Sequence, residues 1–556
     1  MQITVLFLLA AMLTASEAIP MRLTDTVVHR LDPRVFGHFM ERASWGEPGY
    51  ESARLRGTRR LDPRVVSILE SWRIPVIRWP GGTDLTDIDW RDMIDGVPGR
   101  QGDRPPFRSR HAGRAPLSNE FGLEEFLALC RHLGAEPLLP VPLEPALAGE
   151  VAVADLALRH AGLVAYCNAP LGAKLPAGMP DWPAVRATNG HPEPHGVRRF
   201  QLGNEIYCYF DKALERAGKG AAGLDERYVW YRQTLDACVE AMRAVDPSIE
   251  LIMEGCPAPR EPEIERRLLA DAQLRARVPW CVYHDYRPWG IGEVLRDGVA
   301  VDAAGLSAED IWRAWVAGGP GFDAQGQSVT RQGVAAGAQG WRVAITEWNW
   351  NGWWNGLRPA LDSDLAKGVG AASYLHAFMR RPDIGLACQS MLVGSSWGIT
   401  GIRVDPAGLL PPRSLPTGMA VGLYARHHGD RVVALERPEP EGYAQPLRMN
   451  SLLPAAKVAW LDVVCTADDG AWYLHLINRR FAAPERLELD LAALGALQPV
   501  AQHHILEGTL DNSPMAAGDP SCARVREVAV RIDGLRLAVE VPERSVSVLV
   551  LRRSRP

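Results

Sequence analysis

The sequence predicts a protein of the α/β class, in which a (β/α)8 barrel is followed by a C-terminal antiparallel β-sandwich. From Val35 to Arg426, short apolar runs alternate with stretches that have the 3.6-residue period of helices. After Arg426 helical periods become scarce, and short runs are separated by turn residues, as in a sandwich. Strands that alternate regularly with helices form parallel sheets, and eight such units are typical of a TIM barrel with insertions.

The expected barrel strands are eight apolar runs of three to seven residues. They lie at 35–39, 75–78, 136–141, 199–202, 250–253, 281–283, 342–346 and 386–392. The clearest helical stretches between them lie at 62–72, 123–133, 153–166, 226–245 and 364–379. The order of runs and stretches is the strand–helix alternation that a parallel barrel requires.

The sandwich is expected from a second set of runs near the C-terminus. They lie at 472–477, 487–491, 528–532, 535–541 and 546–551, and the segment 21–28 would add a strand before the chain enters the barrel. This pattern divides the mature chain into a sandwich strand at 19–34, a barrel at 35–427 and a sandwich at 428–556.

Residues 1–18 resemble a secretory signal peptide. An apolar run of eleven residues, 5–15, precedes Ser16-Glu17-Ala18, which has small residues where a signal peptidase cleaves. The run is shorter than the ~20 residues that span a membrane. We therefore expect a secreted or periplasmic protein. The alternative is a buried first strand in a cytoplasmic protein, because Lys and Arg are absent from the start of the segment.

The composition argues against several classes of partner. The net charge is −5 and no long basic run occurs, so we expect no nucleic acid. No other apolar run is long enough to cross a membrane, so we expect no membrane partner. The nine Cys form no CxxC pair and the His residues show no metal-ligand spacing, so we expect neither a metal nor a cofactor. The 18 Trp can fill cores or stack on sugars.

Two Glu residues follow expected barrel strands at the face where such barrels carry their active sites. Glu205 ends the sequence Gly-Asn-Glu after the fourth strand, and Glu347 follows Thr346 at the end of the seventh. Two carboxyl groups that face one cavity are the minimum equipment for cleaving a glycosidic bond, because one must donate a proton while the other is ionised. The pair therefore predicts a glycoside hydrolase.

Several motifs resemble glycoside hydrolase family 51, the α-L-arabinofuranosidase family of clan A. They are FGHFME (36–41), RWPGG (78–82), SNEFGLEEF (118–126), NGHPEP (189–194), LGNE (202–205), TEWN (346–349) and, near the C-terminus, Asp511-Asn512 and Ser545-Val546. The motifs extend over nearly the whole chain. The resemblance implies a carbohydrate substrate, an exo-acting enzyme that releases terminal arabinofuranose from plant-type polysaccharides, and assembly into a homo-oligomer.

The resemblance also implies a retaining double displacement. Glu347 would be the nucleophile and Glu205 the acid/base, with Asn204 hydrogen-bonded to the hydroxyl next to the anomeric carbon. Since Glu347 is negative nearby, we expect Glu205 to be protonated in the free enzyme. We also expect the two carboxyl groups to lie about 5–5.5 Å apart, because an inverting enzyme would need a wider spacing.

Further residues would contact the sugar or the catalytic pair. The family resemblance assigns Glu41 to the sugar hydroxyls and Arg78 to the carboxylate of Glu347, while His284 and Tyr286 would position both carboxylates. We expect Trp348, in the Trp-rich segment 348–354, to form a wall on which the sugar stacks.

The sequence departs from the family at three expected pocket positions. Thr83 stands where the family commonly has Asn or Cys, and the eighth strand brings Met391 and Gly394 where a sugar-binding Gln and an Asn are usual. A β-xylosidase, a galactofuranosidase or an endo-β-glucanase of the same clan is therefore the alternative. A non-catalytic carbohydrate-binding protein is the remote one.

Two other motifs indicate different chemistry. The segment GSSWG (394–398) fits the G-x-S-x-G pattern of serine hydrolases, but the residues after it look extended, whereas a nucleophile elbow needs a helix there. The segment GKGAAG (218–223) fits G-x-G-x-x-G but follows a helical stretch, whereas a dinucleotide site needs a preceding strand.

Overall fold

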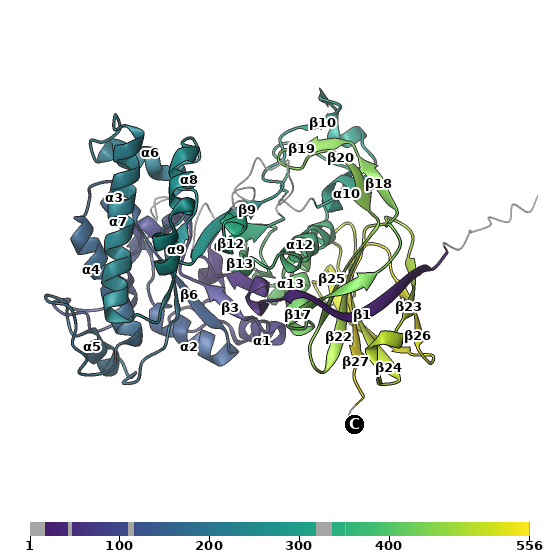
Figure 1. The fold of residues 1–556 in the computed structure, drawn as a ribbon, viewed down its shortest axis with the longest axis horizontal. Helices are drawn as coiled ribbons and strands as arrows, with labels where there is room; N and C mark the ends of the chain where they lie inside the picture. Colours follow the sequence, from purple (N-terminus) through teal and green to yellow (C-terminus); the bar gives the residue numbers. More distant parts are fainter. Residues whose placement is uncertain are drawn as a thin grey trace, which may run out of the picture.

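The computed structural model describes residues 17–42, 47–108, 116–318, 336–350, 352–516 and 518–554. A barrel and a β-sandwich lie side by side, with the barrel on the left in Figure 1 and the sandwich on the right. The expected signal peptide lies almost entirely outside the described residues. No helix in the described part of the chain combines the length and the apolar character needed to cross a bilayer.

Eight parallel strands close the barrel in the order β12-β13-β2-β3-β6-β7-β8-β9. They are β2 (Gly37–Phe39), β3 (Val76–Arg78), β6 (Glu136–Val141), β7 (Arg199–Leu202), β8 (Glu250–Glu254), β9 (Trp280–Tyr286), β12 (Arg342–Asn349) and β13 (Ile384–Ser390). All eight expected strands and the predicted fold class are confirmed. The first strand is shorter than expected because residues Pro33–Phe36 form a 3-10 turn that Asp32 caps.

Helices cover the outside of the barrel. They include α1 (Pro63–Trp72), α2 (Leu123–Leu133), α3 (Glu144–Leu147), α4 (Val153–Asn168), α5 (Trp182–Thr188), α6 (Ile206–Arg216), α7 (Leu224–Val245), α8 (Pro262–Ala270), α9 (Ala272–Arg277), α10 (Ala308–Val316), α12 (Asp364–Met379) and α13 (Pro416–Arg426). The first turn of α1 shows why a helix begins at this point of the sequence. Asp62 accepts a hydrogen bond from the backbone N–H of Arg64, and Pro63 needs no partner at the first helical position.

The sandwich is a nine-stranded sheet in the order β25-β24-β27-β22-β21-β17-β1-β23-β26. Its strands are β1 (Ile19–Arg30), β17 (Arg431–Glu436), β21 (Leu461–Ala467), β22 (Ala471–Asn478), β23 (Glu485–Asp490), β24 (Val500–Gly508), β25 (Ala523–Arg531), β26 (Arg536–Val541) and β27 (Ser545–Arg552). Strand β1 pairs antiparallel with β17 and parallel with β23, so the start of the described chain is part of the C-terminal sheet. Buried and exposed residues alternate along β26, as expected when one face of a sheet is covered.

Short strands decorate the barrel and its junction with the sandwich. They are β4 (Phe107–Arg108), β5 (Pro116–Leu117), β10 (Val294–Arg296), β11 (Val299–Ala300), β14 (Val393–Gly394), β15 (Ile402–Arg403), β16 (Arg413–Ser414), β18 (Gly442–Gln445), β19 (Leu447–Met449) and β20 (Ala455–Ala459). Strand β19 pairs with β10, so the sequence after the barrel also adds a strand to a loop of the barrel.

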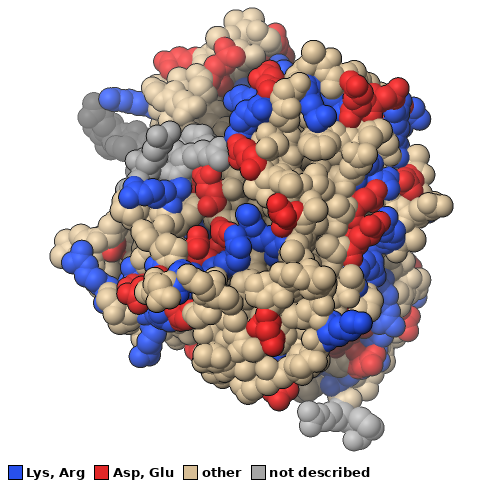
Figure 2. All heavy atoms as spheres, turned by 90° about the vertical axis from the view of Figure 1, so that its left-hand side faces the viewer, with Lys and Arg blue, Asp and Glu red and all other residues tan. Residues whose placement is uncertain are grey.

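Charged side chains of both signs are interspersed over the end of the barrel that Figure 2 shows. Acidic and basic groups alternate there at short range and build no broad field of one sign. An extended positive surface is the usual footprint of a protein that binds nucleic acid, and this face has no such surface.

Helix α12 and Arg479 hold the barrel against the sandwich. Helix α12 is buried on all sides because it packs between the barrel and strands β21, β22 and β27. Arg479, which is 4% exposed, donates to the carbonyls of Val316 and Ala459, to the hydroxyl of Ser373 and to the carboxylate of Asp462. One guanidinium thus satisfies polar groups of both parts.

Replacing Arg479 with Met should therefore destabilise the protein by about 3–5 kcal/mol, because the carbonyls and the carboxylate lose their donor inside the structure. The midpoint of denaturant unfolding would measure the loss. Arg486→Met is the matched control, since Arg486 is half exposed and forms only a 3.7 Å ion pair with Glu540. It should cost less than about 1 kcal/mol. Equal effects of the two substitutions would contradict the role given to Arg479.

Candidate active site

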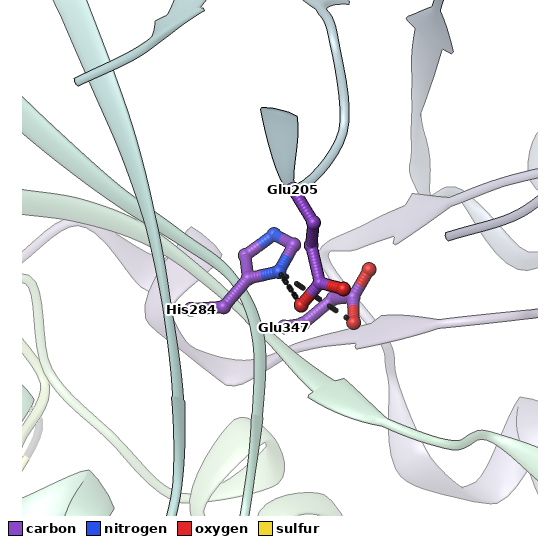
Figure 3. A group of neighbouring side chains, drawn as sticks. All are labelled: Glu205, His284 and Glu347. Atoms are coloured by element: carbon purple, nitrogen blue, oxygen red, sulfur yellow. Dashed lines mark hydrogen bonds and ion pairs between the residues drawn. The ribbon is translucent and has the colours of Figure 1, made fainter. Parts of the chain in front are cut away.

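Glu205 and Glu347 face each other across the mouth of the barrel, with His284 between them (Figure 3). Glu205 follows β7 and caps α6, with φ +46° and ψ +39°. A non-glycine residue in the left-handed region costs energy and is a frequent feature of functional sites. The backbone there turns sharply, and the turn aims the Glu205 side chain over the barrel and away from the helix.

Glu347 reaches the same space through an irregularity in β12. Ala344 faces the barrel interior, whereas Ile345 belongs to the layer between barrel and helices. Strict alternation would therefore turn Glu347 outward. The pairing of β12 with β9 shifts between Ile345 and Glu347. Such a bulge re-aims the following side chain, so the carboxylate of Glu347 enters the mouth.

The distances between the three groups fit a retaining glycosidase. Nδ1 of His284 lies 3.0 Å from Oε1 of Glu205 and 3.6 Å from Oε2 of Glu347. One donor or acceptor atom of each of the three residues lies within 4.8 Å of the others. Retaining enzymes hold their carboxyl groups about 5–5.5 Å apart, and inverting enzymes about 6.5–9.5 Å.

Arg78, on β3, anchors Glu347 from below. Its side chain is fully buried, and Nη1 donates to Oε1 of Glu347 at 2.7 Å. Nη2 donates to Oδ1 of Asn204 at 2.5 Å and Nε to Oε1 of Gln201 at 3.0 Å. The guanidinium also stacks over the ring of Phe39. A buried cation needs this complete set of partners, and Glu347 supplies the opposite charge.

A tyrosine donates to each carboxylate. The hydroxyl of Tyr286 donates to Oε2 of Glu347 at 2.7 Å, and the hydroxyl of Tyr207 donates to Oε1 of Glu205 at 2.7 Å. His284 and Tyr207 both bond to Oε1 of Glu205, which leaves Oε2 as the oxygen that can face a leaving group. Sequence reasoning anticipated Tyr286 but missed Tyr207, which lies two residues after Glu205 in α6.

The proton of the site lies closer to His284 than the sequence predicted. Burial alone would raise the pKa of Glu205, but the hydrogen bond and charge of His284 lower it below its ordinary value. Burial opposes a charged His284, yet the charge of Glu347 and the bond to Glu205 raise the pKa of His284. The expectation of a protonated Glu205 in the free protein is therefore wrong. The shifts favour an ionised Glu205 and a charged His284, and each group supports the charge of the other.

Two further buried carboxyl groups have raised pKa values. Burial first, and then the charges of Glu347 and Asp84, raise the pKa of Glu41 well above its ordinary value. Burial also raises the pKa of Glu254, at the end of β8, to about 8. Burial thus favours the neutral form of both groups, and a neutral carboxyl group can donate a hydrogen bond. Glu254 was not anticipated, because its carboxyl group ends a strand with no motif around it.

Gly82 explains why the motif RWPGG ends in glycine. A Cβ atom at this position would lie 2.7 Å from Oε1 of Glu347 and 3.0 Å from Oε1 of Glu41. Any side chain would displace one of the two carboxyl groups. The backbone of this loop can approach the site only without a side chain.

The carboxyl groups open into a cavity of about 890 Å³. The cavity is lined by five residues that the sequence singled out, Glu41, Thr83, Glu205, Tyr286 and Glu347. Its other lining residues are Cys208, Tyr209, Trp289, Trp353, Lys367, Ser390, Ser396, Trp397, Gly398 and Ile399. The cavity is large enough for more than one sugar ring. Its floor is acidic and its outer wall is largely aromatic.

The chain was compared with known proteins. Residues 68–287 match the family model described as "Alpha-L-arabinofuranosidase 1 domain". An intracellular exo-α-(1→5)-L-arabinofuranosidase of Halalkalibacterium halodurans is 30% identical over 237 residues, which cover 41% of this chain and 40% of the relative. The match thus spans only about two fifths of that curated relative.

The fold similarity extends over almost the whole chain. The crystal structure of a Thermotoga maritima α-L-arabinofuranosidase in complex with arabinose has a TM-score of 0.70 and 21% identity, covering 96% of this chain and 99% of that one. AbfB, a family 51 α-L-arabinofuranosidase from Bifidobacterium longum, has a TM-score of 0.68 and 18% identity, covering 97% of this chain and all of that one.

The matched part of the chain is thus similar to α-L-arabinofuranosidases, and nearly the whole chain has a fold similar to that of family 51 structures. The acidic floor of the cavity brings together most residues that the sequence singled out. One hydrogen-bonded cluster contains Glu205, Glu347, Asn204, Arg78, His284 and Tyr286. Glu41 and Thr83 line the same cavity.

Trp348 is the exception and corrects the sequence prediction. Its side chain is fully buried outside the barrel, where it stacks on Tyr374 and contacts Phe378, both on α12. The bulge that turns Glu347 inward turns the next side chain outward. The exposed aromatic residues of the cavity are instead Trp353, from the same Trp-rich segment, and Trp289, which follows β9.

The two altered positions of the eighth strand, Met391 and Gly394, also lie outside the cavity. Met391 is fully buried and Gly394 packs on Glu47, and neither lines the cavity, whereas Ser390 does. Of the three altered positions, only Thr83 lines the cavity.

The rival motifs fail in the structure. The segment GSSWG starts at the end of β14 and leads through a loop to β15, so no helix follows it. The segment GKGAAG joins helices α6 and α7, with no strand before it. Neither segment forms the strand–turn–helix unit that its chemistry requires.

Among the residues that the structure describes, Glu205, His284 and Glu347 are the group whose donor atoms lie close enough together to hold a metal ion. Arg78 and Tyr286 already bond to the two oxygens of Glu347, and Nδ1 of His284 points at Glu205. Hydrogen bonds within the protein thus account for the positions of these three side chains.

Replacing Glu205 with Gln should lower the pKa of His284, because the imidazolium loses one of its two negative neighbours. Nuclear magnetic resonance of histidine-labelled protein would measure it. His160 is the internal control: burial lowers its pKa to about 4 and its Nε2 bonds to the carbonyl of Pro142, so its signals should stay in place. An unchanged pKa of His284 in the variant would contradict the mutual support of the two charges.

Proposed function

We propose that the protein is a retaining, exo-acting α-L-arabinofuranosidase that releases terminal arabinofuranose from plant-type polysaccharides or oligosaccharides. The observation that carries the proposal is the close pair of carboxylates, Glu205 and Glu347, at the carboxyl ends of β7 and β12. The curated relative from H. halodurans is named for the same activity, and so is the T. maritima enzyme of the same fold.

In the first step Glu347 attacks the anomeric carbon and the glycosidic bond breaks. Arg78 and Tyr286 hold the carboxylate of Glu347 in place, each through a bond of 2.7 Å. Glu205 takes a proton from Nδ1 of His284, rotates its carboxyl group and gives this proton to the departing oxygen, so that His284 ends neutral and Glu205 ends ionised. The product is a glycosyl ester on Glu347 and a free alcohol.

In the second step water hydrolyses the glycosyl ester. In the free protein the negative charge of Glu347 raises the pKa of His284. Esterification of Glu347 removes this charge. Glu205 is now ionised and takes a proton from the attacking water. The water oxygen bonds to the anomeric carbon, the ester bond to Glu347 breaks, and the sugar leaves with its original configuration.

Three groups can bind the sugar itself. Nδ2 of Asn204 is buried and has no hydrogen-bond partner among the described residues, so it can donate to the hydroxyl next to the anomeric carbon. Burial favours a neutral Glu41, which can both donate to and accept from hydroxyls. Thr83 adds a hydroxyl at the cavity wall. A buried amide without a partner favours a ligand that supplies one.

Trp289 and Trp353 take the stacking role that the sequence gave to Trp348. They are 44% and 38% exposed and contact each other edge to face, with ring centroids 4.8 Å apart. Trp289 also contacts Tyr286, which bonds to Glu347. Indole faces beside the nucleophile suit the apolar faces of sugar rings.

Replacing Glu347 with Ala should lower turnover of an aryl α-L-arabinofuranoside by at least about 10³-fold, because no group remains to attack the sugar. Added azide should restore turnover and give a glycosyl azide of inverted configuration. Glu205→Ala should cost about 10²–10⁴-fold on substrates with a poor leaving group. Assays with aryl arabinofuranoside, galactofuranoside, xylopyranoside and glucoside would measure both effects and the sugar preference.

Glu293→Gln is the matched control, since this exposed carboxylate follows β9 but does not line the cavity. It should keep full activity. The configuration of the first product, read by magnetic resonance, should equal that of the substrate. Inversion would contradict the double displacement, and turnover of the xylopyranoside alone would contradict the arabinofuranosidase.

We propose further that residues 1–18 direct export, although the curated relative from H. halodurans is named as intracellular. Expression in a bacterial host and N-terminal sequencing of the purified protein would test this. The mature chain should begin at Ile19 and the protein should lie in the periplasm. Leu8→Arg, in the middle of the apolar run, should block both. An intact Met1 on cytoplasmic wild-type protein would contradict export.

A further inference from the structure

The segment GSSWG (394–398) encloses a buried carboxylate that the catalytic cluster does not use. Glu47 is 1% exposed, and its two oxygens accept four backbone hydrogen bonds. Oε1 accepts from Gly49 at 3.1 Å and from Ser395 at 2.7 Å. Oε2 accepts from Ser396 and from Trp397, both at 2.7 Å. Three consecutive N–H groups that converge on one carboxylate form an anion-binding nest.

The two glycines of the segment fit this arrangement. A Cβ atom on Gly394 would lie 2.7 Å from Cδ of Glu47, so a side chain there would expel the carboxylate. A Cβ atom on Gly398 would lie 2.8 Å from Nζ of Lys367. The G-x-S-x-G spacing resembles a serine hydrolase motif. In this structure the first glycine lets the backbone of the loop approach Glu47, and the last glycine lets it approach Lys367.

The other side of the loop is also fixed. Arg403 donates to the carbonyl of Trp397 at 2.8 Å, and the hydroxyl of Thr400 donates to the same oxygen at 3.2 Å. Glu47 therefore holds the amides of the loop while β15 and the residue Thr400 hold a carbonyl. Arg403 and Thr400 bond only to the carbonyl of Trp397, whereas Glu47 accepts from the N–H groups of all three residues 395–397, so Glu47 is the group that fixes the whole segment.

The loop forms part of the catalytic cavity. Ser396, Trp397, Gly398 and Ile399 all line the space into which Glu205 and Glu347 open. Ser396 is exposed and Trp397 is half-buried, whereas Glu347 is buried. The loop thus belongs to the outer wall, where the part of a substrate beyond the cleaved bond would lie.

We propose that Glu47 is a positioning residue that fixes the 395–397 loop, so that Trp397 forms the wall for the leaving-group sugar of an arabinofuranoside. The link to this substrate rests on the proposed function, whereas the clamp itself does not. Glu47 lies far from Trp397 in the sequence and touches no reacting atom. It acts on binding through the backbone of the loop.

Glu47→Gln tests the proposal, because the amide keeps one acceptor and turns a donor toward N–H groups. Hydrogen exchange of the amides of 395–397 should become faster than in the wild type. The KM for an arabino-oligosaccharide should rise by about tenfold or more, with kcat changed by less than about threefold. Trp397→Ala should raise the KM similarly, and the double variant should be no worse than Trp397→Ala within about twofold.

Asp405→Asn is the matched control. Asp405 also accepts from three backbone amides, those of Ala407, Leu409 and Leu410, but its loop does not line the cavity. Its substitution should leave the KM unchanged within about twofold and the exchange of 395–397 unchanged.

The outcomes separate the two ideas. Unchanged exchange of 395–397 in Glu47→Gln would overturn the clamp. Faster exchange with an unchanged KM would overturn the link to the leaving group, and so would effects of Glu47→Gln and Trp397→Ala that simply add. Wild-type protein that hydrolyses no arabinofuranoside would contradict the proposed function, and the exchange measurement would still decide whether Glu47 holds the loop.

Discussion

The buried guanidinium of Arg78 is the constraint on which the rest of the site depends. A cation with no exposure must have all its donors satisfied and must be paired with a negative charge. Arg78 meets this condition by bonding to Glu347, Asn204 and Gln201, which lie on or just after β12 and β7. The arginine from β3 therefore fixes the nucleophile and the residue beside the acid/base in one rigid cluster, and barrel closure is what brings the three strands together.

The electrostatics of the cluster follow from this pairing. Arg78 and Tyr286 bond to the oxygens of Glu347, whose negative charge then favours a proton on His284. His284 in turn keeps the pKa of Glu205 low. Burial raises the pKa values of the surrounding acids Glu41 and Glu254 and so favours their neutral forms. The site thus brings four carboxyl groups together without requiring four negative charges.

The outer cavity is built by a different principle. Its aromatic wall comes from loops after β9 and β12 and from the segment GSSWG, and loops need anchors if they are to hold a shape. Trp289 and Trp353 support each other by edge-to-face contact, and the backbone around Trp397 is held by Glu47 and Arg403. The inner floor is fixed by strands and the outer wall by such contacts. Substitutions should therefore reshape the wall more easily than the floor.

The sequence by itself determined the eight barrel strands, the sandwich and most of the side chains that meet around Glu205 and Glu347. It could do so because these features are local: apolar periodicity marks a strand, and the residue that follows a strand reaches the active face. Gln201 was also within reach, since it alternates with the outward Phe200 along β7. The tertiary structure alone decided where Trp348 points, because the bulge in β12 depends on its pairing with β9. It alone decided that His284 lies against both carboxylates and that GSSWG holds Glu47. Both arrangements depend on groups that are distant in the chain and become neighbours only when the barrel closes.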